Sequence, residues 1–306
     1  MKSQLTILTA TYNRAHLLPD LYRSLCRQTS KCFVWVVVDD GSIDGTRELI
    51  ANWANEMRLV DNGFDIQYYY QPNGGKDRAI NTGVAHISTP YTMIMDSDDY
   101  LTDDAVEILI DCLSKVKEDD SFAGISGWKA VENKESQRGY NEPLNHLQTD
   151  YVDATNLERK GLGIEKDCCE VYRTDLLKSH PFKVWAGEKF TPEEVVWNQL
   201  ALEGYKLRWF NKVTCIVRYQ EEGLTKDSWN LYRKNPMGYA MMFDHRLLYS
   251  HGWREKVQNV IQFLACCCLA GEYGYISHCN EPVLAYCMFP VGWLLARRRR
   301  RQFGGV

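Results

Sequence analysis

The sequence predicts an α/β protein whose core is a doubly wound, mostly parallel sheet. Over residues 5–70, short apolar segments alternate with segments whose apolar residues recur at helical spacing, as expected when helices connect parallel strands. Residues 33–38 read FVWVVV, an unbroken apolar run that is typical of a strand covered on both faces. Polar clusters follow several of the apolar segments directly, at the expected carboxyl ends of the strands.

The individual elements follow from local patterns in chain order. Leu18, Leu21 and Leu25 share one helical face, and Pro19 is tolerated in a first helical turn. After the third strand, a Gly-rich stretch leads into another amphipathic segment. Strands are expected at residues 5–10, 33–38, 66–70, 91–95, 124–131, 170–172, 207–210 and 214–219. Helices are expected from Leu18, from Thr46, around residues 80–87, and over residues 103–116 and 192–203.

Domain organisation is less sharply marked. Residues 132–150 are polar and are expected to form an exposed loop, and the chain is mainly helical in character from Pro236 onward. No internal repeat or Pro/Ser-rich linker marks a boundary. We therefore assign residues 1–225 to one α/β domain and residues 226–306 to a helical C-terminal region with a basic tail.

Composition and charge limit the classes of function. The 306 residues are 45% hydrophobic and 25% charged, which is ordinary for a globular protein. Five of the 36 basic residues lie together at 297–301; without them, 31 basic and 40 acidic residues leave a net charge of −9. An acidic body argues against nucleic acid as a partner, whereas the basic tail suits an anionic membrane surface.

Cysteine usage and the N-terminus predict a cytoplasmic location. The eleven cysteines include no CxxC pair and no frame typical of a small secreted protein, which indicates reduced, buried thiols. The first residues, MKSQLTILTATYN, fit a strand better than a signal peptide.

Three polar clusters lie at predicted strand ends: residues 9–13 (TATYN), 39–42 (DDGS) and 96–99 (DSDD). Ligands of open parallel sheets bind outside the carboxyl ends of the strands, so the clusters are expected to converge on one crevice. Taken singly, DDGS also suits a turn, and DSDD suits a helix cap or a surface calcium loop. Together they favour a site where carboxylates bind Mg²⁺ or Mn²⁺ and the metal is shared with substrate phosphates.

Four segments carry a resemblance to a known family: TILTATYNRAHLLPDLYRSLCRQT, VVVDDGSIDGT, NGGKDRAINTGVAHISTPYTMIMDSDDYL and FTPEEVVWNQLALEGYKLRWF. They cover most of residues 4–210, and DDGS followed by DSDD is a specific combination. The chain resembles family 2 glycosyltransferases with the GT-A fold, of the kind that build bacterial surface polysaccharides.

The resemblance implies roles for particular residues. It implies that the turn after the first strand and the second acid of DDGS hold the uridine of a UDP-sugar, that the DxD-type acids bind ribose and metal, and that the Gly-rich loop touches the donor. The implied nucleotide-sugar-binding residues are Thr9, Thr11, Tyr12, Asn13, Asp40, Lys76, Arg78, Asp96, Ser97 and Asp98. The implied ligands of Mn²⁺ or Mg²⁺ are Asp96, Asp98 and Asp99.

The family is typically inverting, so a general base must take the proton of the acceptor hydroxyl. The resemblance places that base in an acidic pair at a helix start, which here is Glu193 and Glu194. Only one of two adjacent acids can point into a cleft, and both assignments stay open, with Glu193 favoured because it follows Pro192 directly.

The expected function is transfer of a hexosyl or N-acetylhexosaminyl group from a UDP-sugar to a saccharide or lipid-linked acceptor. Two alternatives are a sugar nucleotidyltransferase and a non-catalytic sugar-nucleotide-binding protein. A nucleotidyltransferase would have a Gly-rich basic loop near its N-terminus, and this chain has none between Ala10 and Leu17. The intact acidic clusters argue against a protein that only binds sugar nucleotides.

The C-terminal segment predicts peripheral association with the inner face of the cell membrane. Its apolar part, residues 282–296, would reach about 22 Å as a helix, short of the roughly 30 Å hydrocarbon core, and Pro290 and Gly292 would disturb it. We expect Phe289, Trp293 and Leu294 to enter the headgroup region while the arginines meet anionic lipid. The alternative is a buried helix with a solvated basic end.

Overall fold

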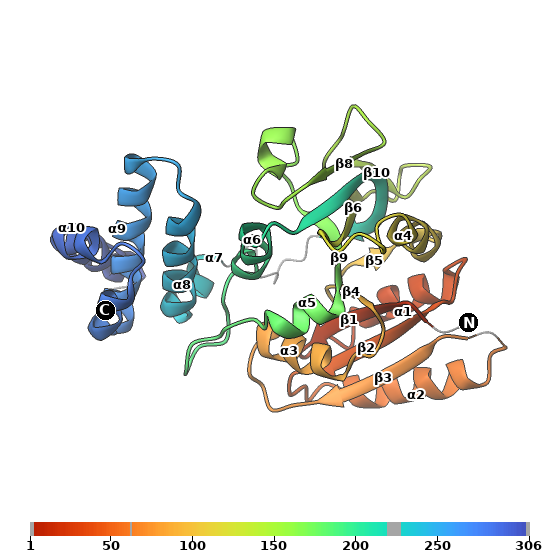
Figure 1. Ribbon diagram of the computed structural model, residues 1–306. Helices are drawn as coiled ribbons and strands as arrows, with labels where there is room; N and C mark the ends of the chain where they lie inside the picture. The colour runs from red at the N-terminus through yellow and green to blue at the C-terminus, as the bar shows by residue number, and fades with distance from the viewer. Residues whose placement is uncertain (1–2, 62, 219–227, 304–306) are drawn as a thin grey trace. The chain divides into compact units, whose positions relative to one another are not determined.

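The computed structural model describes residues 3–61, 63–218 and 228–303 (Figure 1). Its described residues form two compact units. Those within Met1–Pro181 and Asn198–Gln220 make up unit 1, and those within Phe182–Trp197 and Glu221–Val306 make up unit 2. The boundary expected near residue 225 lies outside the described residues. The segment Phe182–Trp197, which contains Glu193 and Glu194, belongs to unit 2. The sequence analysis assigned both residues to the first domain.

Unit 1 is built on a mixed sheet with the strand order β3-β2-β1-β4-β9-β6-β10-β5. Its strands are β1 Leu5–Thr11, β2 Phe33–Asp39, β3 Asp65–Tyr70, β4 Tyr91–Ile94, β5 Tyr100–Leu101, β6 Phe122–Glu132, β7 Tyr140–Pro143, β8 Tyr151–Ala154, β9 Cys168–Arg173 and β10 Lys206–Val217. The first four strands are parallel, as are β6 and β10, while β9 runs antiparallel to both β4 and β6. The predicted class, a mostly parallel α/β sheet, is confirmed.

Helices cover both faces of this sheet (Figure 1). They are α1 Leu18–Arg27, α2 Thr46–Arg58, α3 Lys76–His86, α4 Ala105–Ser114 and α5 Thr174–Ser179, with a 3₁₀ turn at Arg159–Leu162. Helices α1, α2 and α4 pack into one core with the sheet, and α3 packs against β1 and β2 on the other face. A Cβ on Gly83 of α3 would lie 2.3 Å from Cδ1 of Leu8, so a larger residue there would require the Leu8 side chain to move.

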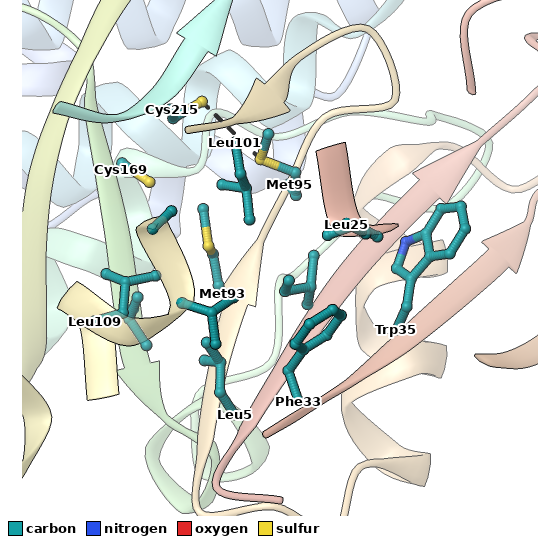
Figure 2. Packing of buried hydrophobic residues seen from close by; sticks show 14 of the residues in the cluster. Leu5, Leu25, Phe33, Trp35, Met93, Met95, Leu101, Leu109, Cys169 and Cys215 are labelled. Carbon is teal, nitrogen blue, oxygen red and sulfur yellow. Dashed lines mark hydrogen bonds between the residues drawn. The ribbon is translucent and has the colours of Figure 1, made fainter. Parts of the chain in front are cut away.

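The main core explains why the apolar runs became strands. Leu5, Phe33 and Met93 come from three neighbouring strands and are almost fully buried. Figure 2 shows them beside Leu25 of α1 and Leu109 of α4. Strands buried on both faces need apolar residues at successive positions, which is the pattern seen in the sequence.

Two local expectations were wrong. The strands predicted at residues 207–210 and 214–219 form one strand, β10, whose register against β6 shifts between Trp209 and Val213. A register shift of this kind leaves some residues of a strand unpaired while the strand continues. Residues 132–150 are not only loop, because β7 pairs antiparallel with β6 there.

Unit 2 contains helices α7 Ser228–Lys234, α8 Pro236–Arg246, α9 Trp253–Ala270 and α10 Pro282–Gln302, with 3₁₀ turns at Leu247–Tyr249 and Tyr273–His278. Helix α6 Glu194–Leu202 begins in unit 2 and ends in unit 1. Helix α9 packs against α8 and α10 around Val260, Phe263 and Leu264, which are fully buried. The expected helical character from Pro236 onward is confirmed.

Helix α10 is continuous through Pro290 and Gly292, so the expected disturbance was wrong. A Cβ on Gly292 would lie 2.4 Å from the Cβ of Leu264, so the absence of a side chain at Gly292 lets α10 approach α9 closely. The packing stabilises a helix that local propensity alone would weaken.

The N-terminus of α8 is held by a carboxylate from the segment Phe182–Trp197. Glu188 is 8% exposed and accepts hydrogen bonds from the amides of Met237 (2.7 Å) and Gly238 (2.8 Å). These amides belong to the first helical turn and have no partner within the helix. Burial raises the pKa of Glu188 against the lowering effect of the two amides.

Replacing Glu188 by glutamine is expected to lower the free energy of unfolding by about 1–3 kcal/mol, because Met237 and Gly238 donate to different carboxylate oxygens and the glutamine NH₂ group cannot accept in place of one of them. Urea unfolding followed by hydrogen exchange at the α8 amides measures this. The matched control is Glu255→Gln, which alters an exposed carboxylate that accepts from the His251 amide at the start of α9. Equal, small effects of both substitutions would show that Glu188 does not hold the helix.

Candidate active site

The three polar clusters come together at the carboxyl edge of β1, β2 and β4. Thr11 at the end of β1 pairs in register with Asp39 at the end of β2, and the Met95 amide after β4 donates to the carbonyl of Leu8 on β1 (2.8 Å). The predicted convergence of the clusters is confirmed. It follows from the parallel arrangement, which places all three strand ends at one edge.

The DDGS turn is tied to the Gly-rich loop by the carboxylate of Asp40. Its Oδ1 accepts from Gln71 Nε2 (2.7 Å) and the Gly74 amide (2.8 Å), and its Oδ2 accepts from the Gly75 amide (2.8 Å). Gly41 has φ of 90°, and a Cβ there would lie 2.8 Å from the Asn73 nitrogen, so the turn requires glycine. Asp40 therefore fixes the position of the loop that precedes α3.

Asp39 holds the same turn from its other side. Its Oδ1 accepts from the Ser42 amide (2.7 Å), and its Oδ2 accepts from the Tyr68 hydroxyl of β3 (2.7 Å). Burial and the bond to Asp39 raise the pKa of Tyr68 to about 12, so the phenol stays protonated as a donor. Both acids of the DD pair thus hold the turn that follows β2.

The turn after β1 places only part of its cluster at the surface. Tyr12 is 48% exposed, and Asn13 has φ of 52° and bonds through its amide to Ser42 Oγ (2.8 Å). Thr9 is fully buried and its hydroxyl accepts from Trp35 Nε1 (3.1 Å), while Thr11 is 3% exposed. Both threonines belong to β1, which is buried on both faces, and their contact with a nucleotide stays a prediction.

The acidic loop after β4 carries two acid–cation pairs. Asp96 lies 2.7 Å from the Lys76 ammonium at the start of α3, and this cation holds the pKa of Asp96 well below its usual range. Asp98 lies 3.3 Å from the Arg14 guanidinium, which also donates to Ser97 Oγ (3.2 Å). Asp96 and Asp98 are therefore each matched by a cation from another element.

Asp99 faces a different environment. It is 5% exposed, its Oδ1 accepts from the Arg218 amide (3.3 Å), and its Oδ2 lies 3.7 Å from Lys129 Nζ. Burial raises the pKa of Asp99 to about 7, although Lys129 opposes that effect. Burial alone would lower the pKa of Lys129. The nearby acids, first of all Asp167 at 2.7 Å, outweigh burial and raise the pKa of Lys129.

The expected three-carboxylate metal site is not formed as such. Across the part of the chain that the structure describes, no three His, Cys, Asp or Glu side chains are placed to hold a metal ion together. Asp99 bonds inward, whereas the side chains of Asp96 and Asp98 are 40% and 15% exposed. Their oxygen-only chemistry fits Mg²⁺ or Mn²⁺ with the remaining ligands supplied by substrate phosphates and water.

The Gly-rich loop also orients the remaining predicted cation. Arg78 on α3 donates to the carbonyl of Gly74 (2.7 Å), which keeps its guanidinium next to the loop. Lys76 stands two residues earlier, at the first position of the helix. A helix N-terminus carrying a cation favours an anionic ligand.

Glu193 and Glu194 lie in unit 2 at the start of α6. The Glu193 carbonyl accepts from the amide of Val196 (3.0 Å), within the first helical turn. Glu194 forms a two-bond pair with Arg246 of α8, with Nε to Oε1 at 2.6 Å and an Nη to Oε2 at 2.8 Å. The side chain of Glu194 is therefore engaged by a cation within unit 2.

Sequence reasoning missed Arg14, Lys129 and Arg246. Arg14 directly follows the polar cluster 9–13, so its place in that turn was a usable signal for a partner of the acidic loop. Lys129 stands alone in an apolar strand, which is also an unusual position. Arg246 gives no local signal, because it meets Glu194 across 52 residues of chain.

The fold, with its acidic loop at the carboxyl edge of parallel strands, defines the protein as a glycosyltransferase. A sequence profile described as Glycosyl transferase family 2 matches residues 6–180, more than half of the chain. The chain belongs to this family.

Known proteins agree with this assignment. The chain is 24% identical over 219 residues to a poly-beta-1,6-N-acetyl-D-glucosamine synthase of Staphylococcus aureus, covering 71% of this chain and 50% of that protein. The chain spans about a fifth to a half of the length of the first curated relatives it matches.

Two solved structures share the fold. Staphylococcus aureus TarS 1–349 in complex with UDP-GlcNAc has a TM-score of 0.54 at 17% identity, covering 99% of this chain and 92% of that one. The mannosyltransferase PcManGT of Pyrobaculum calidifontis, in complex with GDP-Man and Mn²⁺, has a TM-score of 0.57 at 15% identity and coverages of 99% and 83%. At these identities the likeness concerns the fold.

Proposed function

We propose that this protein transfers a sugar from a UDP-sugar to a saccharide or lipid-linked acceptor in the synthesis of a bacterial surface polysaccharide. The observation that carries the proposal is the pair of acid–cation contacts, Asp96–Lys76 and Asp98–Arg14, at the carboxyl edge of the parallel strands. Two acids suit a divalent cation, and two cations suit a diphosphate. Membership of the glycosyltransferase family favours this function over a sugar nucleotidyltransferase.

The proposed donor is a UDP-sugar of the N-acetylhexosaminyl type. TarS has been solved with UDP-GlcNAc, and a relative is named as a synthase of poly-N-acetylglucosamine. Uracil would be held by Tyr12, Asn13 and Asp40. Among the described residues Asp40 Oδ2 accepts one hydrogen bond, which leaves it capacity for the N3–H that uracil has and cytosine lacks.

Metal dependence is part of the proposal. Asp96 and Asp98 would hold Mn²⁺ or Mg²⁺, and PcManGT, which shares the fold, was solved with Mn²⁺. When bound, such an ion neutralises charge on the departing diphosphate. Lys76 and Arg14 stand beside the same two acids and would bind the phosphate oxygens directly.

We assign the general base to the Glu193–Glu194 pair and favour Glu193. Arg246 occupies both carboxylate oxygens of Glu194, which restricts that acid's ability to take a proton. Glu193 at the same helix start would accept the proton of the acceptor hydroxyl as that oxygen attacks the anomeric carbon. Attack from the face opposite UDP makes the reaction inverting.

The location of the reaction is proposed to be the inner face of the cell membrane, where a lipid-linked acceptor would be available. The support is the basic end of α10, which contains Arg297–Arg301.

A donor and metal screen tests the function directly. We expect UDP release from UDP-GlcNAc, above that from other UDP-sugars and from GDP-mannose, when Mn²⁺ and a polysaccharide or lipid-linked acceptor are present. EDTA should remove this activity and added Mn²⁺ should restore it. Full turnover in EDTA would refute the metal assignment, and a preference for GDP-mannose would refute the donor assignment.

A further inference from the structure

Helix α10 has two different faces. Leu284, Ala285, Gly292 and Ala296 are buried, and they lie on the side that packs against α9 and the 3₁₀ turn Tyr273–His278. Phe289 also packs, partly buried, against this core, so it is not part of the exposed face. Burial of one side fixes the rotation of the helix and decides which side chains remain outside.

The opposite face is exposed and apolar over its first three turns. Val283 is 77% exposed, Tyr286 62%, Leu294 57%, and Trp293 and Val291 about 40%. At about 100° per residue, the exposed positions 283, 286, 287, 290, 291, 293 and 294 fall within an arc of about 160°. This apolar strip is continuous rather than scattered, and an exposed strip of this kind marks a contact surface.

The arginines divide between the two faces. Arg299 donates to the Tyr232 hydroxyl and to Gln262 Oε1, and Arg300 donates to the carbonyl of Cys268, so both are engaged within unit 2. Arg297, Arg298 and Arg301 point outward and continue the apolar strip. With Leu294 and Gln302 they line an open hollow. Of the five arginines expected to meet anionic lipid, Arg299 and Arg300 therefore already have partners within unit 2.

The exposed face carries positive charge without compensation. Residues 282–303 contain no Asp or Glu, and none of Arg297, Arg298 and Arg301 pairs with an acid anywhere in the described chain. The rest of the protein is acidic. A surface that is apolar at one end and cationic at the other matches the acyl boundary and the headgroups of an anionic bilayer.

We propose that α10 docks lengthwise on an anionic lipid surface through this face, which we call the α10 strip: Val283, Tyr286, Cys287, Pro290, Val291, Trp293, Leu294, Arg297, Arg298 and Arg301. The helix lies in the plane of the surface, with the apolar part in the headgroup boundary and the three arginines on phosphate or carboxylate groups. Within the described residues, no helix combines the length and apolar character needed to cross a bilayer.

A second copy of the chain fits the same face less well. A two-fold contact would place the α10 strip against itself, and the strip offers no carboxylate to three arginines. This inference rests on the proposed membrane location and is independent of the proposed chemistry, because lipid binding is measured without a sugar donor.

The test is sedimentation of the full chain with sucrose-loaded vesicles of phosphatidylcholine, with or without 30 mol% (about a third) phosphatidylglycerol. We expect binding to the anionic vesicles only, weakened by salt. The variant R297Q/R298Q/R301Q should lose about 100-fold in partitioning, since each arginine near an anionic surface contributes about fivefold. The matched control, R58Q/K117Q/K134Q, removes three exposed cations from unit 1 and should bind normally.

The exposed Cys287 provides a second measurement on the unsubstituted protein. Labelling by a membrane-impermeant maleimide, resolved by peptide mass spectrometry, should slow severalfold at Cys287 when anionic vesicles are added. Labelling of Cys26, Cys32 and Cys112, which are partly buried in unit 1, should not change. Protection that rises with protein concentration in the absence of lipid would overturn the proposal in favour of self-association. Equal partitioning of the arginine variant and its control would also overturn it.

Discussion

Replacing Asp98 by alanine is expected to abolish sugar transfer and to weaken metal-dependent UDP binding by at least about tenfold. The carboxylate would be lost from the two-acid loop, and Arg14, 3.3 Å away in the structure, would be left without its partner. Two protein carboxylates contribute a large share of the ligands in such a site, since the rest come from phosphate and water. Calorimetric titration of UDP with and without Mn²⁺ measures the effect.

The matched control for Asp98 is Asp103→Ala. Asp103 forms a comparable pair with Arg27 (2.9 Å), and its side chain is 61% exposed. This substitution should leave both activity and UDP affinity near those of the original protein. If Asp98→Ala keeps its Mn²⁺-dependent UDP affinity, the acidic loop serves as a cap for the following helix and the metal assignment is wrong.

Replacing Glu193 by glutamine is expected to lower kcat by about two to four orders of magnitude with little change in UDP-sugar affinity, because a missing general base affects proton transfer rather than donor binding. Glutamine keeps the size of the side chain and removes its basic oxygen. Single-turnover transfer, together with UDP-sugar titration, separates the two quantities.

Glu194→Gln should have the smaller effect on kcat and a larger effect on stability. Glutamine cannot form the two-bond charged pair that joins Glu194 to Arg246. Arg246→Gln is the companion variant, and it should resemble Glu194→Gln in both stability and turnover. A loss of turnover found only in Glu194→Gln would move the base to Glu194 and give Arg246 the role of orienting it. Near-normal turnover in both glutamate variants would place the base elsewhere.

Local patterns were sufficient for the first half of the sheet. The strands predicted at residues 5–10 and 33–38 differ from β1 and β2 by one residue each, and the sequence also predicted where α2 begins. These elements are buried on both faces or amphipathic, so their apolar spacing is set by the element itself. The convergence of the polar clusters followed from them, because parallel neighbours end at one edge.

The C-terminal region shows where local reasoning failed. Pro290 and Gly292 predicted a disturbed helix, whereas α10 is continuous and Gly292 packs closely against Leu264. The run of five arginines looked uniform, yet Arg299 and Arg300 bond inward while their neighbours point outward. Helix rotation decides this difference, and rotation is set by what the helix packs against.

By itself, the sequence determined that this chain folds as a mostly parallel α/β protein and that its acids gather at one edge of the sheet, because each follows from spacing along a few neighbouring residues. Only the tertiary structure decided which charges meet. Asp98 pairs with Arg14, Asp99 faces Lys129, and Glu194 pairs with Arg246. The partners are separated by 30 to 84 residues. Such contacts depend on how distant elements are brought together, and no local pattern contains that information.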